Sequence, residues 1–424
     1  MKLTIEKLIY GGDGLARSAE GKAVFVPLVL PGEEVVTDIV DEKPGFIRAS
    51  LKEILEPSEK RIQPECPYFG RCGGCHYQHT DHENQLEIKV AILRETFRRT
   101  GKFDWDGEVI IHSSEPWHYR NRTRLRVSIQ GGFAIGYRRL SSHELLPVEQ
   151  CPISSPLINR ALTRLWQLGR DGRVPQVISE IEFFVNHDDS ELLLELYGVP
   201  PVAGLQEFFR DVQAGVPELK GMGIFTLMGQ HSFGLPELKQ AAGQPFLFYQ
   251  AGDWQFRVSA GSFFQVNRFL VDELVRTVME GVSGRMALDL YAGVGLFANH
   301  LAKRFHQVFA VESSLFSAAD LQANAQKAVT VVQATTEQFL QKSMNLKPDL
   351  VVVDPPRAGV NEAASKLLAA QRVPRIVYLS CDPTTLARDL RLLLEFGYRV
   401  EEVHLIDLFP QTFHIEALVK LSRA

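Results

Sequence analysis

The sequence predicts a multidomain α+β protein with a small N-terminal β-barrel, a central α/β segment and a C-terminal doubly wound α/β domain. A chain of 424 residues is longer than one hydrophobic core usually serves. Short β-rich runs fill residues 1–57, whereas apolar runs alternate with helical segments over residues 251–424. We therefore expect three domains, which span residues 1–57, 58–250 and 251–424.

The composition is that of an ordinary soluble protein, with 45% hydrophobic and 23% charged residues. No run approaches the ~20 apolar residues that a membrane helix needs, and the N-terminus does not resemble a signal peptide. We expect a cytoplasmic monomer with no membrane partner. The net charge of −5 does not indicate a nucleic-acid binder, so any basic patch must be local.

The N-terminal segment consists of four or five short β-rich runs separated by turns. The runs are "KLTIEKL", "GKAVFVPLVL", "EEVVTDIVDEK" and "FIRASLKEIL", and the turns are "YGGDGLA" and "LPGEE". So many short strands in about sixty residues suggest a closed barrel of OB type. Such a barrel could bind nucleic acid or be an appendage without a binding role, because a fold does not fix a function.

The central segment contains an amphipathic helix, "NQLEIKVAILRETFRRTGK", over residues 84–102. Its apolar positions recur at helical spacing, so we expect Leu86, Val90, Leu93 and Phe97 to form the buried face.

An arginine-rich strand follows in "WHYRNRTRLRVSIQ". Alternate residues of a strand share a face, and the arginines on that face are Arg120, Arg122, Arg124 and Arg126. They could form an ordinary solvated face or bind phosphate through the planar guanidinium fork. Residues 178–197 read as two acidic strands around a turn, and acidic strands are poor candidates for binding a polyanion.

The C-terminal segment alternates strand and helix from "RMALDLYAGVG" to "HIEALVKLSR". Apolar strands separated by helices predict a mostly parallel, Rossmann-like sheet that is covered on both faces. The last two strands have no helix between them and should form an antiparallel hairpin.

A glycine-rich turn, "DLYAGVGLFA", connects the first strand of this segment to a helix. Gly293-x-Gly295-x-x-Ala298 fits a nucleotide-binding turn, and Glu312 ends the next strand, where it can accept hydrogen bonds from ribose. The turn suits NAD and S-adenosylmethionine equally well. Asp354 in "VVVDPPRAG" ends another strand, and the two prolines that follow it stiffen an acceptor that faces the pocket.

Two further residues have the chemistry of a catalytic pair. Cys381 precedes a helix that begins with Asp382 as N-cap and Pro383 as first residue, so the helix dipole should lower the pKa of the thiol. Glu416 lies in an apolar strand, which should raise the pKa of its carboxyl and suit it to proton transfer.

Three of the five cysteines, Cys66, Cys72 and Cys75, lie within ten residues. In a reducing compartment, clustered cysteines bind metal or carry out chemistry more often than they form disulfides.

Together these motifs resemble the RNA uracil-5 methyltransferases along nearly the whole chain. "SFFQVN", "DLYAGVG", "VDPPRAG", "LSCDP" and "HIEALVKLSR" follow the order of the family's catalytic motifs, and the N-terminus looks like its TRAM domain. "CPYFGRCGGC" and "EQCPIS" match the ligands of a [4Fe–4S] cluster in the branch that acts on 23S ribosomal RNA; these are Cys66, Cys72, Cys75 and Cys151. Four thiolates alone would suit zinc or an iron–sulfur cluster equally, and the resemblance favours iron–sulfur.

The resemblance implies methylation of C5 of an RNA uridine with S-adenosylmethionine as methyl donor. Cys381 would add to uracil C6, Glu416 would remove the C5 proton, and Asp354 would orient the base. The cofactor would contact Gln265, Tyr291, Gly293, Gly295, Glu312, Thr335 and Asp354. The barrel, the cluster domain and the four arginines of the strand would hold RNA. The chain departs from the family pattern at Ala292, Leu296 and Thr335–Thr336.

Four alternatives remain. A transfer-RNA enzyme would share this catalytic domain, and a non-catalytic RNA-binding assembly factor would keep the barrel and cluster. A radical enzyme would also combine an iron–sulfur cluster with S-adenosylmethionine, but its three cysteines have a different spacing. An NAD-dependent oxidoreductase would use the same sheet.

Overall fold

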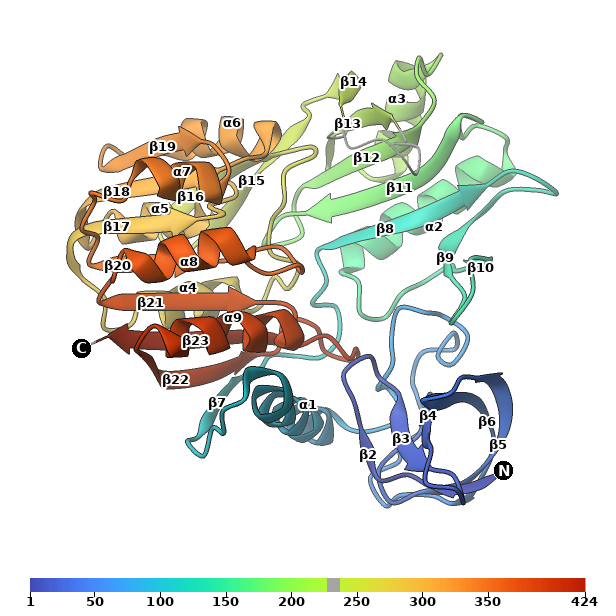
Figure 1. The fold of residues 1–424 in the computed structure, drawn as a ribbon. Helices are drawn as coiled ribbons and strands as arrows, with labels where there is room; N and C mark the ends of the chain where they lie inside the picture. The colour runs from blue at the N-terminus through green and yellow to red at the C-terminus, as the bar shows by residue number, and fades with distance from the viewer. Residues whose placement is uncertain (227–236, 424) are drawn as a thin grey trace.

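The computed structural model describes residues 1–226 and 237–423, and Figure 1 shows their arrangement. The C-terminal sheet with its covering helices lies beside the central sheet, and the N-terminal sheet lies below, next to α1 (His82–Thr96). Across these two ranges, no helix is long and apolar enough to cross a membrane.

The N-terminal segment folds into a six-stranded sheet with the order β1-β5-β6-β4-β3-β2. Its strands are β1 (Lys2–Thr4), β2 (Lys7–Leu8), β3 (Gly14–Arg17), β4 (Ala23–Val26), β5 (Glu34–Glu42) and β6 (Phe46–Glu56). Alternate residues point inward, as Val24 and Val26 do, and with Leu3, Ile5 and Val35 they form a small separate core. The β-rich runs of the sequence are therefore strands.

The central segment forms a seven-stranded sheet with the order β10-β9-β8-β11-β12-β13-β14. Its strands are β8 (Arg122–Ser128), β9 (Ala134–Arg138), β10 (Leu145–Pro147), β11 (Ile178–Val185), β12 (Leu192–Gly198), β13 (Leu219–Thr226) and β14 (Leu238–Gly243). Two helices, α2 (Pro156–Arg170) and α3 (Leu205–Gly215), pack on this sheet and share its apolar core.

The C-terminal segment is built on an eight-stranded sheet with the order β19-β18-β17-β20-β21-β23-β22-β7. Its strands are β7 (Val109–His112), β17 (Gly284–Leu290), β18 (Phe305–Glu312), β19 (Val329–Gln333), β20 (Leu350–Val353), β21 (Arg375–Ser380), β22 (Tyr398–Ile406) and β23 (Glu416–Arg423). The pairs within β17–β21 are parallel, and β22 and β23 form the expected antiparallel hairpin.

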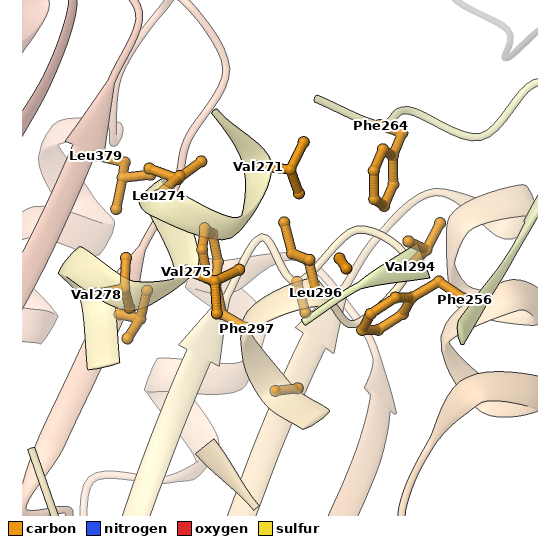
Figure 2. Close-up of a cluster of buried hydrophobic side chains, with 14 of the residues drawn as sticks. Phe256, Phe264, Val271, Leu274, Val275, Val278, Val294, Leu296, Phe297 and Leu379 are labelled. Atoms are coloured by element: carbon orange, nitrogen blue, oxygen red, sulfur yellow. The ribbon is translucent and has the colours of Figure 1, made fainter. Parts of the chain in front are cut away.

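Helices cover both faces of this sheet, as expected for a doubly wound domain. One face carries α4 (Val271–Met279), α5 (Leu296–Leu301) and α6 (Leu315–Asn324). The other carries α1, α7 (Thr336–Lys342), α8 (Glu362–Ala370) and α9 (Pro383–Glu395). Figure 2 shows how Leu274 and Val278 of α4 pack with Phe297 of α5 and Leu379 of β21 on the first face. The central strands β20 and β21 are apolar because both of their faces are buried.

The structure divides the chain differently from the expected boundary of 58–250. Strand β7 pairs in parallel with β22 and so completes the C-terminal sheet, and α1 packs on the same domain through α9. The hairpin β15 (Phe246–Ala251) and β16 (Trp254–Ser259) also joins the C-terminal core, so position 250 falls inside a structural unit. These pairings connect residues far apart in sequence, which local patterns do not reveal.

The buried face of α1 also differs from the expected one. The helix ends at Thr96, and a π-helical turn, η1 (Phe97–Gly101), follows it. Leu93 and Phe97 are buried as expected, but Leu86 and Val90 are only half-buried. Their places on the inner face are taken by Gln85, Ile88, Lys89 and Ile92. The helix is rotated because Gln85 and Lys89 find polar partners in the loop before β23.

Candidate active site and cysteine cavity

Cys381 lies where β21 ends and α9 begins, at the carboxyl edge of the sheet. Asp382 is the N-cap of α9, and its carboxylate accepts hydrogen bonds from the backbone N–H groups of Thr384 and Thr385, at 2.9 Å and 3.0 Å. Burial, together with Glu416 and Asp354, raises the pKa of the Cys381 thiol to about 12. The expectation of a lowered pKa is therefore wrong for the free protein, because burial and, after it, two nearby carboxyl groups outweigh the end of the helix.

Glu416 is placed beside Cys381 by strand register. Ser380 of β21 pairs with Ala417 of β23, so the residue after Ser380 and the residue before Ala417 are neighbours. The Glu416 side chain is buried, and burial followed by repulsion from Asp354 raises its pKa well above the usual value. The direction of this shift agrees with the expectation from its apolar strand.

Asp354 follows β20, which is the parallel neighbour of β21. Burial raises the pKa of its carboxyl to about 7. Gln265 donates a hydrogen bond to Asp354 Oδ2 at 3.3 Å, and Asn121 in turn donates one to the backbone oxygen of Gln265 at 3.0 Å. The structure therefore brings together Gln265, Asp354, Cys381 and Glu416 from four separate parts of the chain.

The glycine-rich turn connects β17 to α5 in a left-handed conformation. Tyr291, Gly293 and Gly295 have φ values of 65°, 55° and 94°. A Cβ at Gly295 would lie 2.7 Å from Leu321 Cδ1, whereas one at Gly293 would meet nothing within 4 Å. Gly295 is thus required for packing, and Gly293 borders open space that a ligand can occupy.

Glu312 supports this turn from the end of β18. Its two carboxylate oxygens accept hydrogen bonds from the backbone N–H groups of Gly293 at 2.9 Å and Ser314 at 2.6 Å. A carboxylate has about four acceptor positions, so Glu312 retains the capacity to bind hydroxyl groups of a ligand.

Asp289 is a candidate site residue that the sequence reasoning missed. It lies at the beginning of the "DLYAGVG" motif, its side chain is fully buried, and neither carboxyl oxygen has a hydrogen-bond partner. Burial, Asp354 and Glu312 raise the pKa of its carboxyl. A buried, unpartnered carboxyl group is costly, which indicates a site built for a polar or cationic ligand.

Thr335 is the N-cap of α7. Its side chain is exposed, and its hydroxyl oxygen accepts a hydrogen bond from the backbone N–H of Gln338 at 3.2 Å. The Gln338 side-chain oxygen in turn accepts a hydrogen bond from the backbone N–H of Thr335, which completes a capping box. The expected contact of Thr335 with the cofactor stays a prediction. Thr336, which is buried and interacts with Tyr291, lies on the inner side.

Arg357 and His414 also border the catalytic residues and were not predicted. Arg357 Nη2 lies 3.3 Å from His414 Nε2, and the Arg357 backbone oxygen accepts a hydrogen bond from the Thr385 hydroxyl at 3.1 Å. The positive charge of Arg357 opposes the raised pKa values of Cys381 and Glu416. Both residues lie within the quoted motifs, Arg357 directly after the Asp-Pro-Pro turn, and this position was the available signal.

Four cysteines share one cavity of about 450 Å³. Its thiol lining consists of Cys66, Cys72, Cys75 and Cys151, all of them free of disulfides. In the part of the chain that the structure describes, no group of His, Cys, Asp and Glu residues has the spacing to hold a metal ion. Burial, with smaller contributions from Cys151 and Cys66, raises the pKa of the Cys72 thiol to about 11.

The arginine-rich strand β8 does not form a free basic face. Arg122 pairs with Glu182 and Glu195, Arg124 pairs with Glu182, and Arg126 lies 3.6 Å from Glu180. The acidic strands β11 and β12 thus pair with these arginines, although Arg124 and Arg126 keep 45% and 38% of their side chains exposed. That the arginines hold RNA phosphates stays a prediction. Arg122 also donates to the Ser262 backbone oxygen and so supports the segment that carries Gln265. Arg120 lines the cysteine cavity.

Comparisons with known proteins identify the family of the chain. Residues 81–424 match the family model of tRNA (uracil-5-)-methyltransferase. An RNA methyltransferase of Aquifex aeolicus is 34% identical, with 100% of this chain and 98% of the relative covered. One of Streptomyces coelicolor is 32% identical, with 100% and 93% covered.

The fold has a solved counterpart in Pyrococcus abyssi tRNA (uracil-54, C5)-methyltransferase in complex with S-adenosyl-L-homocysteine. Its TM-score is 0.78, its sequence identity is 24%, and 99% of this chain and 100% of that chain are covered. The chain belongs to the tRNA (uracil-5-)-methyltransferase family and is an S-adenosylmethionine-dependent RNA (uracil-5-)-methyltransferase.

Proposed function

We propose that the protein methylates C5 of one specific uridine in 23S ribosomal RNA through a covalent adduct between Cys381 and uracil C6. The observation that carries the proposal is the meeting of Cys381, Glu416 and Asp354 in one buried site at the carboxyl edge of the sheet. Ligands of open α/β sheets bind at this edge. A nucleophile, a proton acceptor and an orienting group are what substitution at uracil C5 requires.

The residues around the glycine-rich turn fit S-adenosylmethionine. This cofactor has a cationic sulfonium, an ammonium group and ribose hydroxyls, and it supplies an electrophilic methyl group. The unpartnered oxygens of Asp289 and the remaining acceptor positions of Glu312 suit its ammonium and hydroxyl groups. The open space beside Gly293 allows the backbone to approach the cofactor closely. Tyr291 and Gln265 complete this side of the site.

The chemistry begins at Cys381. Its thiolate forms a bond to uracil C6, and the electron pair of the C5–C6 double bond moves into the ring as an enolate. C5 then bonds to the transferred methyl group while the bond between that methyl group and the sulfonium breaks. Because burial and two carboxyl groups raise the pKa of the Cys381 thiol, the thiol must release its proton to solvent after the RNA binds and before the bond to C6 forms. Arg357 is the positive group positioned to stabilise it.

Glu416 completes the reaction. Its buried carboxylate accepts the proton from C5, the electron pair of that C–H bond restores the C5–C6 double bond, and the bond between C6 and Cys381 breaks. A raised carboxyl pKa makes the group a stronger base once it is ionised. Asp354, held by Gln265, is suited to orient the polar edge of uracil.

The cysteine cavity supports a second part of the proposal, a [4Fe–4S] cluster held by Cys66, Cys72, Cys75 and Cys151. Four thiols in one cavity supply the donor set, which suits zinc and an iron–sulfur cluster equally, and the resemblance of the cysteine motif favours the cluster. Gln78 supports the segment, since its Oε1 accepts a hydrogen bond from the Cys66 backbone N–H at 3.3 Å. The cluster, together with the N-terminal sheet as a TRAM-type RNA-binding domain, favours ribosomal RNA.

Transfer RNA is the second candidate substrate, because the solved counterpart is named for uracil 54 of tRNA. One experiment separates the two. Labelled methyl groups from S-adenosylmethionine are offered to unmodified 23S ribosomal RNA and, separately, to unmodified transfer RNA. We expect 5-methyluridine in the ribosomal RNA and none with Cys381→Ala. Label found only in transfer RNA would show that transfer RNA, not ribosomal RNA, is the substrate. Full activity of Cys381→Ala would exclude the route through a covalent adduct with Cys381.

Glu416→Gln provides the internal control for the mechanism. It should add the methyl group but fail to release the RNA, so a protein–RNA adduct stable to denaturing electrophoresis should accumulate. An inactive Glu416→Gln enzyme without this adduct would contradict the assigned role.

A further inference from the structure

The N-terminal sheet reaches the active site through one side chain, Tyr10. Tyr10 follows β2, and its hydroxyl donates a hydrogen bond to the Cys381 backbone oxygen at 3.4 Å. Its ring meets Phe413 edge to face, with centroids 5.5 Å apart and planes at 87°. The N-terminal sheet therefore borders the active site through Tyr10.

Phe413 is the centre of an aromatic rim, which we define as Tyr10, His76, Phe413 and His414. The Phe413 ring lies 4.5 Å from the His76 ring and 4.2 Å from the His414 ring. All four side chains remain partly exposed. Three separate segments of the chain thus place aromatic side chains beside the nucleophile. Tyr10 and Phe413 pack against the core of the C-terminal domain and still keep part of their surface exposed.

Three cavities border this rim. His76, Phe413 and His414 line the cysteine cavity, and two further open cavities are each lined by one residue of the rim. One, of about 490 Å³, is lined by the turn at Gly11–Asp13, His76, Arg138 and Arg139. The other, of about 510 Å³, is lined by Tyr10, Phe25, Arg17, Arg99 and the first turn of α9. The guanidinium of Arg138 has no carboxylate partner among the described residues, unlike the paired arginines of β8.

The rim thus lies between two cavities lined by arginines. Arg138 has no carboxylate partner among the described residues, whereas Arg17, Arg99 and Arg139 each lie within 4 Å of a glutamate. A single RNA strand has this alternation, with bases that stack and phosphates on either side. A base that reacts inside a pocket must leave its stack, and the gap must be filled for the flipped state to persist.

We propose that Tyr10 and Phe413 form a stacking platform that takes the place of the target uridine in the RNA stack and contacts the neighbouring base. This inference rests on the proposed function, because it concerns how RNA reaches the same site. Neither residue takes part in bond making. They position the substrate, and the N-terminal sheet supplies half of the platform.

The test compares rings with aliphatic side chains of similar size. Phe413→Leu and Tyr10→Leu keep most of the packing but remove the aromatic face, whereas Phe413→Trp and Tyr10→Phe keep the face. Loss of one stacked base should lower kcat/KM for RNA roughly 10- to 100-fold in the two Leu variants and leave the aromatic variants near wild type. Affinity for S-adenosylmethionine should not change.

A second readout measures delivery of the base directly. RNA transcribed with 5-fluorouridine has no C5 proton to remove, so it traps the covalent adduct with Cys381. The Leu variants should form this adduct more slowly by the same factor. Wild-type adduct rates in both Leu variants, or a loss of S-adenosylmethionine binding in them, would overturn the platform. A wild-type enzyme that methylates neither RNA would instead overturn the proposed function, and the platform with it.

Discussion

At the scale of single residues, Asp354 shows how the site is maintained at a cost in stability. Burial raises the pKa of its carboxyl from 3.8 to about 7, so the folded state holds a proton that the unfolded state has lost. The contribution of Asp354 to the free energy of unfolding therefore falls as the pH rises from about 4 to about 7, and above pH 7 it falls no further. Active sites often retain such unfavourable groups because the chemistry needs them.

Asp354→Asn should therefore stabilise the protein at pH 8, by at most about 4 kcal/mol, while reducing methyl transfer. The gain should shrink when urea unfolding of both proteins is compared at pH 5, because the wild-type carboxyl is then protonated in the folded state. An equal difference in unfolding free energy at both pH values would show that ionisation of Asp354 is not the cause.

The sequence singled out Cys381 and Asp354 because each follows the end of a predicted strand, where ligands bind, and Glu416 because it is a carboxylate in an otherwise apolar strand. It misjudged the pKa of Cys381 because burial and the carboxyl groups of Glu416 and Asp354 depend on segments that are distant in the chain. The capping box of Thr335 with Gln338, by contrast, is a local feature that the sequence contains.

At the scale of elements, α1 holds the loop that carries Glu416 toward Cys381. Lys89 and Asp407 are fully buried and lie 2.6 Å apart, and His82 also contacts Asp407, at 2.7 Å. Lys89 also donates a hydrogen bond to the Phe409 backbone oxygen. A buried ion pair is weak evidence of net stabilisation, but removal of one partner leaves an uncompensated charge.

Lys89→Met should consequently lower the free energy of unfolding by about 3 kcal/mol, the lower end of the usual range because His82 remains. The matched control is Lys7→Met, which removes the half-exposed pair with Glu95 and should cost at most about 1 kcal/mol. The double variant Lys89→Met, Asp407→Asn should recover part of the loss. If urea denaturation shows that Lys89→Met lowers the free energy of unfolding no more than Lys7→Met does, the buried ion pair of Lys89 and Asp407 is not formed as described.

The periodicity of α1 predicted a helix but not which face is buried, because the buried face depends on partners that are distant in the chain. Gln85 and Lys89 count as polar in any sequence pattern, yet both face inward because the loop 407–411 offers them partners. The arginines of β8 depend on distant partners as well. The sequence predicted that they share one face of a strand, but their partners on β11 and β12 could be assigned only once the strand order was known.

At the scale of the whole molecule, the cysteine segment and the catalytic loop are joined at Gln411. Its backbone oxygen accepts the N–H groups of His76 and Tyr77, at 2.8 Å and 3.0 Å, directly after Cys75. Gln85 of α1 accepts the Gln411 backbone N–H at 2.9 Å. The φ of Gln411 is 68°, an uncommon conformation that its surroundings must maintain. Order in the cysteine segment is therefore transmitted to residues 412–416.

This connection predicts what happens when a cysteine ligand is lost. Cys72→Ser should lose iron and sulfide in anaerobically purified protein, melt at a lower temperature and transfer methyl groups more slowly, because the segment that holds Gln411 is released. Binding of S-adenosylmethionine should be retained, because its proposed site at Gly293 and Glu312 is at another part of the carboxyl edge of the sheet. Cys381→Ser is the matched control, since it should keep iron, sulfide and melting temperature while losing activity. Zinc without sulfide in the wild type would contradict the cluster, and full activity of Cys72→Ser would contradict the coupling through Gln411.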